Sequence, residues 1–329
     1  MSTVLFTGAG GAALPWMIAH LKGQGYRVLA ADMDPRAAGL FLADRGFIIP
    51  AGLSADFLPA VRKICREENV RCFIPLVDEE LINAISLENE TLAVLTPRLG
   101  FITLCLDKYA LMKALAEQGV GAPETVLASE YRGQGKGPFL VKPRRGRGSR
   151  GVHRFVSRKD LEQHLSLEKG SLQDILVQEL VEGPEFTISV VAWRDGAVQA
   201  VVPKEILSKR GITRMAVTRR SEAIDRACRK VQDILHADGP FNVQLCLDAR
   251  TGEPKIFEIN PRFSTSVTLT VAAGIDEVGG LLRQAVEGRA SHSFAAWKEG
   301  LVMVRQFSDA FYPEDQLTQN APVDRRGTL

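Results

Sequence analysis

Short apolar strands alternate with helices over residues 1–106, and this rhythm constrains the fold more than any other feature of the chain. Such alternation predicts a parallel sheet with helices on both faces, because each strand must cross over through a helix to pair with the next. The expected strands lie at 4–7, 27–31, 72–76 and 93–95. One helix is expected to follow the first strand and to end near residue 25, and two more are expected at 55–68 and 81–90.

The rhythm changes at residue 107. A helix over 107–118 begins at the cap Asp107 and ends before Gly119, and the turn Arg194-Asp195-Gly196 favours a β-hairpin. These signals predict an α+β region with antiparallel pairing. Its expected strands are 139–142, 151–156, 175–178, 186–193, 197–203, 241–247, 255–259 and 301–307, and its expected helices are 157–165, 221–236, 264–273 and 276–288.

Composition narrows the class of protein. Among 329 residues, 41 lysines and arginines nearly balance 39 aspartates and glutamates, so the net charge is +2. A dedicated nucleic-acid binder is normally more basic, and no apolar stretch approaches the roughly 18 residues of a membrane span. The five cysteines form no C-x-x-C pair, and the N-terminus has no signal-peptide pattern. We therefore expect a cytoplasmic protein whose partners include neither nucleic acid nor a membrane.

A glycine-rich turn follows the first strand. Gly8, Gly10 and Ala13 fit the pattern G-x-G-x-x-A, and Asp32 ends the next strand, where a dinucleotide-binding protein places the acid that binds ribose. Small residues let backbone N–H groups at a helix N-terminus approach an anion. Any tight strand-to-helix turn favours the same residues, so a structural turn or a turn that lines a substrate pocket remains open beside an NAD site.

Three oxygen-bearing side chains are expected to converge on one hairpin. Strands 241–247 and 255–259 flank a turn centred near residue 251, which places Gln244 opposite Glu258. Asn260 lies two residues beyond Glu258 and therefore on the same face. Hard oxygen donors with one carboxylate suit Mg²⁺ carried by a nucleotide polyphosphate. Arg262 follows and is able to fork onto a phosphate. The alternative is that Glu258 and Asn260 simply face solvent.

Lys142 lies in an apolar strand directly before the segment 144–151, Arg-Arg-Gly-Arg-Gly-Ser-Arg-Gly. This segment combines flexible backbone with guanidinium and hydroxyl donors, so we expect it to fold over phosphates. It has no Walker pattern, because Gly135-Lys136 is followed by Gly137. An RNA-binding interpretation lacks the interleaved aromatic residues that such segments use. An outward-facing edge-strand lysine is the alternative for Lys142.

Taken together and in order, these segments resemble an ATP-grasp ligase, and in particular a single synthetase unit of the carbamoyl-phosphate synthase large subunit. The segments that carry the resemblance are Asp107-Lys108, 139–143, 144–151, 177–187, 242–244 and 258–262. The resemblance implies a Rossmann-like pre-ATP-grasp domain over residues 1–106 and a two-lobed ATP-grasp fold behind it. The small lobe with the glycine/arginine loop would span 107–180, and the large lobe with the metal site and the C-terminal tail would span 181–329.

The resemblance also implies roles for individual residues. Lys108, Lys142 and Ser149 would contact the nucleotide, and Arg262 would steady the transferred phosphoryl group together with Lys142. The adenine would lie in a hinge, with Glu185 on the ribose hydroxyls. The metal would be Mg²⁺, with Mn²⁺ as an alternative. The hinge residues are Gln178, Glu179, Leu180 and Val181, and the metal ligands are Gln244, Glu258 and Asn260.

The sequence departs from carbamoyl-phosphate synthase in two ways. Lys142 stands where that family has an arginine, and the chain has one ATP-grasp unit with no glutaminase. We therefore expect a smaller reaction, in which ATP activates a carboxylate as an acyl phosphate that an amine or similar nucleophile displaces. The substrates would be small molecules, and a homodimer is left open. The rivals are an NAD-dependent oxidoreductase and a nucleotide-binding protein without catalysis.

The acceptor pocket is expected between the domains. Lys204, Arg214 and the turn Ser264-Thr265-Ser266 are candidates for its lining. Asp78 and Glu79 follow a strand and are candidates for reading a substrate amine. The alternative for this acidic pair is the cap of a helix.

Overall fold

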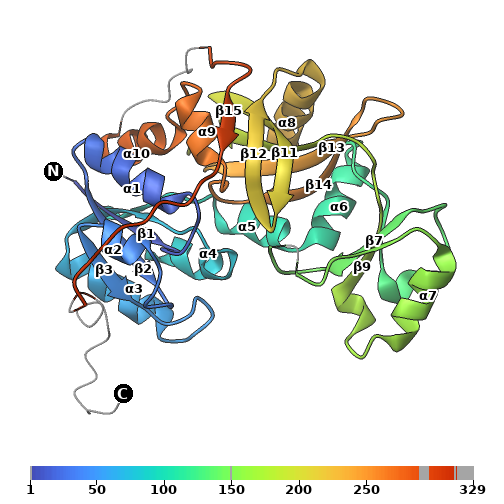
Figure 1. Cartoon of the computed structure of the whole chain (residues 1–329), viewed down its shortest axis with the longest axis horizontal. Coiled ribbons are helices and arrows are strands. Elements are labelled where there is room, and N and C mark those ends of the chain that lie inside the picture. The colour runs from blue at the N-terminus through green and yellow to red at the C-terminus, as the bar shows by residue number, and fades with distance from the viewer. Residues whose placement is uncertain (1, 149, 289–295, 315, 317–329) are drawn as a thin grey trace.

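A computed structural model describes residues 2–148, 150–288, 296–314 and 316 of the chain. Its strands form a five-stranded, a six-stranded and a four-stranded sheet. Figure 1 shows them in a row, with the five-stranded sheet at the N-terminal end, the six-stranded sheet in the middle and the four-stranded sheet at the far side. No helix among the described residues is long and apolar enough to cross a membrane.

The five-stranded sheet is parallel, as the alternation of strand and helix predicts. Its strand order is β3-β2-β1-β4-β5, so the chain leaves β1 toward one side for β2 and β3 and toward the other side for β4 and β5. The carboxyl ends of β1 and β4 therefore flank a topological switch point, where open α/β sheets bind their ligands. The strands are β1 (Thr3–Thr7), β2 (Arg27–Asp32), β3 (Arg45–Ile48), β4 (Val70–Ile74) and β5 (Ala93–Val94).

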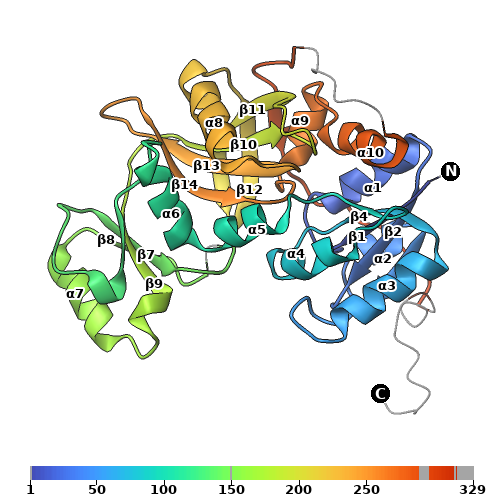
Figure 2. The same ribbon diagram turned by 180° about the vertical axis from the view of Figure 1, so that it is seen from behind.

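Helices cover both faces of this sheet because successive strand residues point to opposite sides. Val4 and Phe6 pack with α1 and with α10 from the C-terminal region, whereas Leu5 packs with α3. Figures 1 and 2 both show α10 beside α1. The helices are α1 (Leu14–Gly23), α2 (Gly39–Leu42), α3 (Phe57–Glu67), α4 (Asp78–Ala84), α5 (Leu99–Leu106) and α10 (Glu277–Glu287), with a 3₁₀ turn η1 at Ile85–Leu87.

The six-stranded sheet is antiparallel, in the order β14-β13-β10-β11-β12-β15. Its apolar face packs against α5, α6 and α8. The elements are α6 (Lys108–Glu117), β10 (Glu185–Val191), β11 (Ala200–Arg210), β12 (Ile212–Thr218), α8 (Glu222–Leu235), β13 (Phe241–Leu247), β14 (Pro254–Asn260), α9 (Val267–Ala272) and β15 (Val302–Val304).

The four-stranded sheet is smaller and carries α7 on one face (Figure 2). Its core is a separate cluster that includes Phe139, Val141, Leu161 and Val177. The elements are β6 (Thr125–Leu127), η2 (Ala128–Glu130), β7 (Phe139–Pro143), β8 (His153–Phe155), α7 (Arg158–Leu167), η3 (Leu172–Asp174) and β9 (Ile175–Glu179). This antiparallel lobe, the six-stranded sheet and the parallel domain confirm the predicted fold class.

Five helices and strands were missing from the expectation: α2, β3, α5, β6 and β12. β12 is the instructive case. β11 continues to Arg210, and Gly211 turns the chain directly into β12 with φ +71°. The exposed residues 207–211 hide the alternation that would mark the two strands. The turn at Arg194–Gly196 does join the antiparallel neighbours β10 and β11, as expected.

Candidate active site

Three side chains from three elements meet between the six-stranded and the four-stranded sheet. Lys108 is the first residue of α6, Lys142 lies in β7 and Glu258 lies in β14. The Lys108 Nζ lies 3.4 Å from Glu258 Oε1 and donates to the Gly146 carbonyl at 2.6 Å. The Lys142 Nζ donates at 3.2 Å to the carbonyl of Phe257, the residue before Glu258. The structure thus brings two predicted phosphate ligands and one predicted metal ligand together.

Lys142 is 5% exposed, so the edge-strand alternative does not describe it. Burial lowers its pKa to about 8, with Lys108 also lowering it and Glu258 opposing the shift. Its ammonium has no carboxylate within ion-pair distance among the described residues, and the neutral Phe257 carbonyl is its hydrogen-bond partner. Because the positive charge of Lys142 is only partly balanced by its neighbours, an anionic ligand would stabilise it.

The metal-type hairpin forms with the predicted register, in which Gln244 lies opposite Glu258 and Asn242 opposite Asn260. Asn242 was missed, although the same counting across the turn pairs it with Asn260. Asn242 Nδ2 donates to the Arg262 carbonyl at 2.9 Å, and Asn260 Nδ2 donates to Asn242 Oδ1 at 3.3 Å. The amide group of Asn260 is thereby turned so that its oxygen is left without a hydrogen-bond donor among the described residues.

This donor set fits a hard cation. One carboxylate and amide oxygens on one face of a hairpin are ligands that Mg²⁺ accepts when phosphate oxygens and waters complete its shell. The Lys108 ammonium already pairs with Glu258, so a cation is held at this carboxylate in the present arrangement. No cluster of three or more histidine, cysteine or acidic side chains suited to a metal occurs within the described ranges.

Arg262 links the hairpin to the N-terminal domain. Its Nε donates to Asp78 Oδ1 at 2.5 Å, and its Nη1 donates to the Phe263 carbonyl at 3.2 Å. Asp78 is the first residue of α4, so it lies at the end of the loop that follows β4. Asp78 was a candidate for a substrate amine, but in this structure its carboxylate holds Arg262 instead. The predicted phosphoryl-binding arginine therefore lies at the switch point of the parallel sheet.

Carboxylates hold the first half of the arginine loop, which is therefore not left free for phosphates. Arg144 Nη2 lies 2.7 Å and Arg145 Nη2 2.9 Å from Asp107 Oδ2. Arg147 Nε donates to Glu79 Oε2 at 2.8 Å. Three of the four arginines that we expected on the polyphosphate thus bind protein carboxylates here. Ser149 lies outside the described residues.

The predicted adenine hinge joins β9 to the loop before β10. The Leu180 N–H donates to the Pro138 carbonyl at 2.9 Å and the Glu179 N–H to the Glu124 carbonyl at 2.8 Å. The Val181 N–H has no acceptor in the described part of the chain. The Gln178 side chain is buried and donates to Thr125 Oγ1 at 2.7 Å. Backbone groups near Val181 are therefore available to a ligand, whereas the amide nitrogen of Gln178 is not.

Glu185 begins β10 beyond this hinge. Lys209 Nζ, near the end of β11, donates to Glu185 Oε1 at 2.6 Å. The carboxylate of Glu185 is about a quarter exposed, so it can be reached from solvent. Its second oxygen has no donor among the described residues.

The glycine turn after β1 uses its acid internally. Asp32 Oδ2 accepts from the Gly10 N–H at 2.9 Å and Asp32 Oδ1 from the Asp34 N–H at 3.0 Å. Gly8 adopts φ +71°, and a Cβ there would lie 2.8 Å from Val77 Cγ2. Asp32 therefore closes the turn that an NAD site would need open, which favours the alternative of a structural or pocket-lining turn.

Lys204 does not line an open pocket, contrary to our expectation. It is fully buried, and its Nζ donates to Ser189 Oγ at 2.7 Å and Thr270 Oγ1 at 2.8 Å. Weaker contacts reach Ser264 Oγ and the Ser266 carbonyl. Glu277 accepts from the same Ser189 hydroxyl at 2.8 Å, so this buried charge has a compensating one. Lys204 reaches the turn 264–266 from inside the fold.

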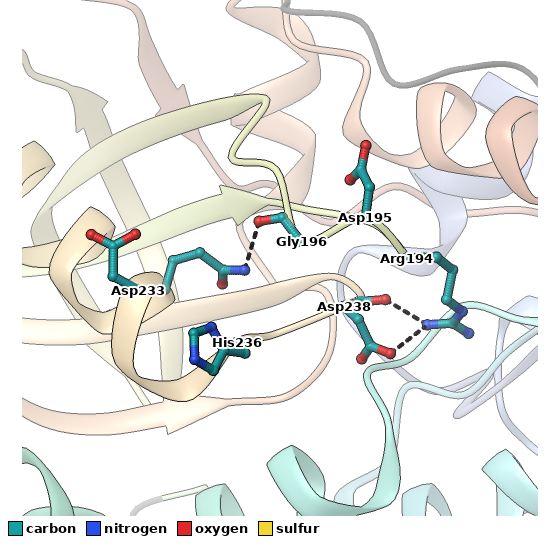
Figure 3. Close-up of a pocket in the computed structure, with 7 residues that line it drawn as sticks. Arg194, Asp195, Gly196, Asp233, His236 and Asp238 are labelled. Carbon is teal, nitrogen blue, oxygen red and sulfur yellow. Dashed lines mark hydrogen bonds and ion pairs between the residues drawn. The ribbon is translucent and has the colours of Figure 1, made fainter.

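Two cavities lie away from these residues. Figure 3 shows one of about 350 Å³, which lies between the β10–β11 turn and the C-terminal end of α8. It is lined by Arg194, Asp195, Gly196, Gln232, Asp233, His236 and Asp238, and so shares no residue with the predicted nucleotide site. A neighbouring cavity of about 410 Å³ shares Arg194 with it.

Comparison with known proteins bears on both halves of the chain. A family model described as ATP-grasp in the biosynthetic pathway with Ter operon matches residues 171–308. A model of the PylC-like N-terminal domain matches residues 4–96. The ADP complex of N5-carboxyaminoimidazole ribonucleotide synthetase has the same fold, with a TM-score of 0.74 over 92% of this chain and 81% of that one, at 17% identity.

Two curated relatives match parts of the sequence. The D-alanine–D-alanine ligase of Corynebacterium aurimucosum is 35% identical over 109 residues, which are 31% of this chain and 31% of that ligase. The carbamoyl phosphate synthase large chain of Xylella fastidiosa is 23% identical over 285 residues, 77% of this chain and 26% of that protein. The chain spans less than a third of the length of either relative. The chain thus resembles ATP-grasp proteins in three respects: residues 4–96 match the PylC-like N-terminal domain, residues 171–308 match an ATP-grasp model, and the fold is that of a solved ATP-grasp enzyme.

Proposed function

We propose that this protein is an ATP- and Mg²⁺-dependent ligase that joins a small carboxylate substrate to an amine. The observation that carries the proposal is the convergence of Lys108, Lys142 and Glu258 from three separate elements. Two lysines beside one carboxylate form a site for a polyphosphate and its cation, and neither an NAD-dependent oxidoreductase nor a binding protein without catalysis requires that set. The names of the relatives, which include a D-alanine–D-alanine ligase, point to the same class of reaction.

The residues have separate tasks in this proposal. The free N–H of Val181 and the neighbouring backbone hold the adenine, and the second oxygen of Glu185 accepts a ribose hydroxyl. Lys108 and Lys142 bind phosphate oxygens, and Lys108 leaves Glu258 as it does so. Glu258 and Asn260, with Gln244, would hold Mg²⁺, which neutralises phosphate charge when it is bound. The nucleotide binds between two lobes, residues 107–180 and residues 181–329. The N-terminal domain, residues 1–106, forms one side of the pocket for the acceptor substrate.

The reaction then needs positioning more than side-chain chemistry. A carboxylate oxygen of the first substrate attacks the γ-phosphorus of ATP, the bond to the β-phosphate oxygen breaks, and ADP leaves. Arg262, held by Asp78, steadies the transferred phosphoryl group. The amine attacks the acyl carbon, inorganic phosphate leaves, and the amine nitrogen loses a proton. No side chain becomes covalently modified.

ADP release over a matrix of small carboxylates and amines tests the proposal directly. We expect release that requires one carboxylate, and a hydroxamate when hydroxylamine replaces the amine, because hydroxylamine traps acyl phosphates. Thermal shift with ATP·Mg²⁺ against NAD⁺ separates the oxidoreductase alternative. A response to NAD⁺ with none to ATP·Mg²⁺ would refute the ligase assignment.

Glu258→Gln tests the metal site. The substitution keeps the shape of the side chain but removes its charge, so we expect turnover to fall by at least about a hundredfold, the size of losing one strong electrostatic contact in the transition state. Glu253→Gln is the matched control, since Glu253 is an exposed carboxylate in the turn of the same hairpin. Unchanged turnover in Glu258→Gln would show that the metal ligands are assigned wrongly.

A further inference from the structure

Arg305 joins three segments that are far apart in sequence. It follows β15, where the chain turns back across the N-terminal domain (Figure 1). Its Nη1 donates to the Ala12 carbonyl and its Nη2 to the Thr265 carbonyl, each at 2.7 Å. Its Nε donates to the Thr213 carbonyl at 3.1 Å, and Nη2 also lies 3.9 Å from Met303 Sδ. The guanidinium is thus fixed between the glycine turn after β1 and the turn that follows Arg262.

All the oxygen acceptors of Arg305 are neutral carbonyls. No carboxylate lies within ion-pair distance of it among the described residues. The backbone N–H of Arg305 donates to the Arg214 carbonyl at 2.8 Å, so the two arginines are neighbours across adjacent strands, and the Arg214 guanidinium lies 5.1 Å from the Phe307 ring centroid. Arg214 also has no ion pair in the described part of the chain. Burial and the charge of Arg214 lower the pKa of Arg305. Two cations therefore adjoin each other without a counter-charge.

The guanidinium has capacity left for a ligand. Arginine carries five N–H groups. Three of those on Arg305 reach oxygen acceptors and a fourth, on Nη2, reaches only the sulfur of Met303, which leaves one on Nη1 without an acceptor among the described residues. The side chain is only partly exposed, so this N–H group is not solvated as it would be on an open surface. A purely structural role, in which Arg305 only joins three segments, would explain its hydrogen bonds to carbonyls. It would not explain why a second arginine, Arg214, lies beside it. An anion would satisfy both guanidiniums at once.

Arg305 and Arg214 lie next to the proposed phosphoryl site. Thr265 is three residues beyond Arg262, so the pair adjoins the phosphoryl site on the side of the N-terminal sheet. Lys108, Lys142 and Glu258 bound that site from the other side, where the nucleotide is expected. The reacting carboxylate must lie at the γ-phosphate, and an anion at Arg305 is therefore a group that does not itself react.

We propose that Arg305, assisted by Arg214, binds a non-reacting anionic group of the amine substrate, either a carboxylate or a phosphate monoester. The inference rests on the proposed ligase function and specifies its acceptor class as an amine that carries an anion. The glycine turn supplies one wall of this subsite and the turn 264–266 supplies the other.

Calorimetry on the full chain saturated with MgADP tests the subsite without requiring turnover. Two matched pairs of amines serve as probes: β-alanine against propylamine, and O-phosphoethanolamine against ethanolamine. We expect the anionic member of at least one pair to bind at least tenfold more tightly than its neutral partner. The pair with the larger ratio identifies the anion as carboxylate or phosphate.

Variants localise the effect. Arg305→Met should bring that ratio close to one, while Arg305→Lys keeps part of it, because an ammonium preserves the charge but not the planar fork. Arg219→Met is the control and should keep the full ratio, since Arg219 is paired with Glu205. If Arg305→Met fails to fold, Arg214→Met leaves the carbonyl contacts of Arg305 intact and should lower the ratio about threefold.

A ratio near one in the unaltered protein, or one that survives in both Arg305→Met and Arg214→Met, would overturn the proposal. Such a result leaves the ligase assignment standing, provided that ATP·Mg²⁺ binds and ADP is released in the presence of a carboxylate. Absence of carboxylate-dependent ADP release defeats the proposed function instead, whatever the probes bind.

Discussion

At the scale of single residues, Lys142 is a buried cation in the proposed nucleotide site. Its pKa of about 8 in this structure reflects burial, only partly offset by Glu258. Phosphate oxygens would favour the charged form and raise the pKa again. Binding of ATP near pH 8 should therefore be coupled to uptake of a proton by Lys142.

We predict that the affinity for ATP·Mg²⁺ falls as the pH rises from 7 to 9 and that this dependence disappears in Lys142→Met. The variant should bind ATP roughly tenfold more weakly at pH 7, about the contribution of one charged hydrogen bond. Calorimetry in two buffers of different ionisation enthalpy measures the proton uptake. Lys136→Met, an exposed lysine in the preceding loop, is the control. Equal uptake by Lys142→Met and the unaltered protein would contradict the prediction.

Glu80 is a buried carboxyl at the switch point of the parallel sheet. It accepts a hydrogen bond from Thr7 Oγ1 at 2.5 Å, and burial raises its pKa to about 7, with Asp32 and Glu79 adding to the shift. In the unfolded chain its pKa returns to 4.5. The folded state therefore binds more protons between about pH 4.5 and pH 7, and its stability falls as the pH rises through that window.

Glu80→Gln should remove this loss. The amide keeps an oxygen that can accept from Thr7 but carries no charge to bury, so the variant should be more stable than the unaltered protein at pH 8, by up to about 3 kcal/mol at 1.36 kcal/mol per pKa unit. At pH 5, just above the unfolded pKa, the difference should fall to about 1 kcal/mol or less. Urea denaturation at both pH values measures it, with Glu79→Gln as the neighbouring, more exposed control. The same difference at pH 5 and pH 8 would rule out this account.

At the scale of elements, Asp107 ties the arginine loop to the start of α6. Its side chain caps the helix by accepting from the Ala110 N–H at 3.2 Å and also pairs with Arg144 and Arg145. The sequence predicted the cap, because Asp before a helical pattern is a local signal. The two ion pairs could not be predicted, since they cross the gap of more than thirty residues between Asp107 and the loop.

Asp107→Asn separates these two roles, because asparagine caps a helix as well as aspartate does but carries no charge. We expect the helix to persist and the loop to loosen. Trypsin should cleave after the arginines of residues 144–150 several-fold faster in the variant without nucleotide. Asp160→Asn, which alters an exposed carboxylate in α7, should leave the rate unchanged. An unaltered rate in Asp107→Asn would show that the ion pairs do not hold the loop.

At the scale of the whole molecule, Arg194 connects the five-stranded and six-stranded sheets. From the turn between β10 and β11, its Nη2 donates to Glu88 Oε1 at 2.7 Å and to the Val94 carbonyl at 3.1 Å. Its Nη1 donates to the carbonyls of Thr96 and Asp238, and its guanidinium stacks on Trp193 at 4.1 Å. The partly buried guanidinium of Arg194 therefore connects the N-terminal domain to the ATP-grasp region.

Arg194→Lys should lose most of these contacts. A single ammonium group cannot contact the Glu88 carboxylate and the several backbone carbonyls at the same time, as the two ends of a guanidinium do. We predict a loss of about 3 kcal/mol in the free energy of unfolding, the usual cost of breaking a buried charged network. Urea denaturation measures it, and Arg226→Lys on the exposed face of α8 should change it by less than about 0.5 kcal/mol. A loss no larger than that of the control would mean that the interface does not depend on Arg194.

The sequence by itself determined the elements and the pairings that follow from local periodicity. The alternation in residues 1–106 produced the parallel sheet, and counting across one turn placed Gln244 opposite Glu258. Such features depend on neighbours a few residues apart, where backbone geometry leaves few choices.

Only the tertiary structure decided which charges meet. It placed Lys204 in the interior, turned three loop arginines onto carboxylates and brought Arg305 to the turn after Arg262. A long side chain can reach many partners, and the choice among them depends on the path of distant loops and on how much charge each position leaves buried. Those quantities exist only once the chain has packed.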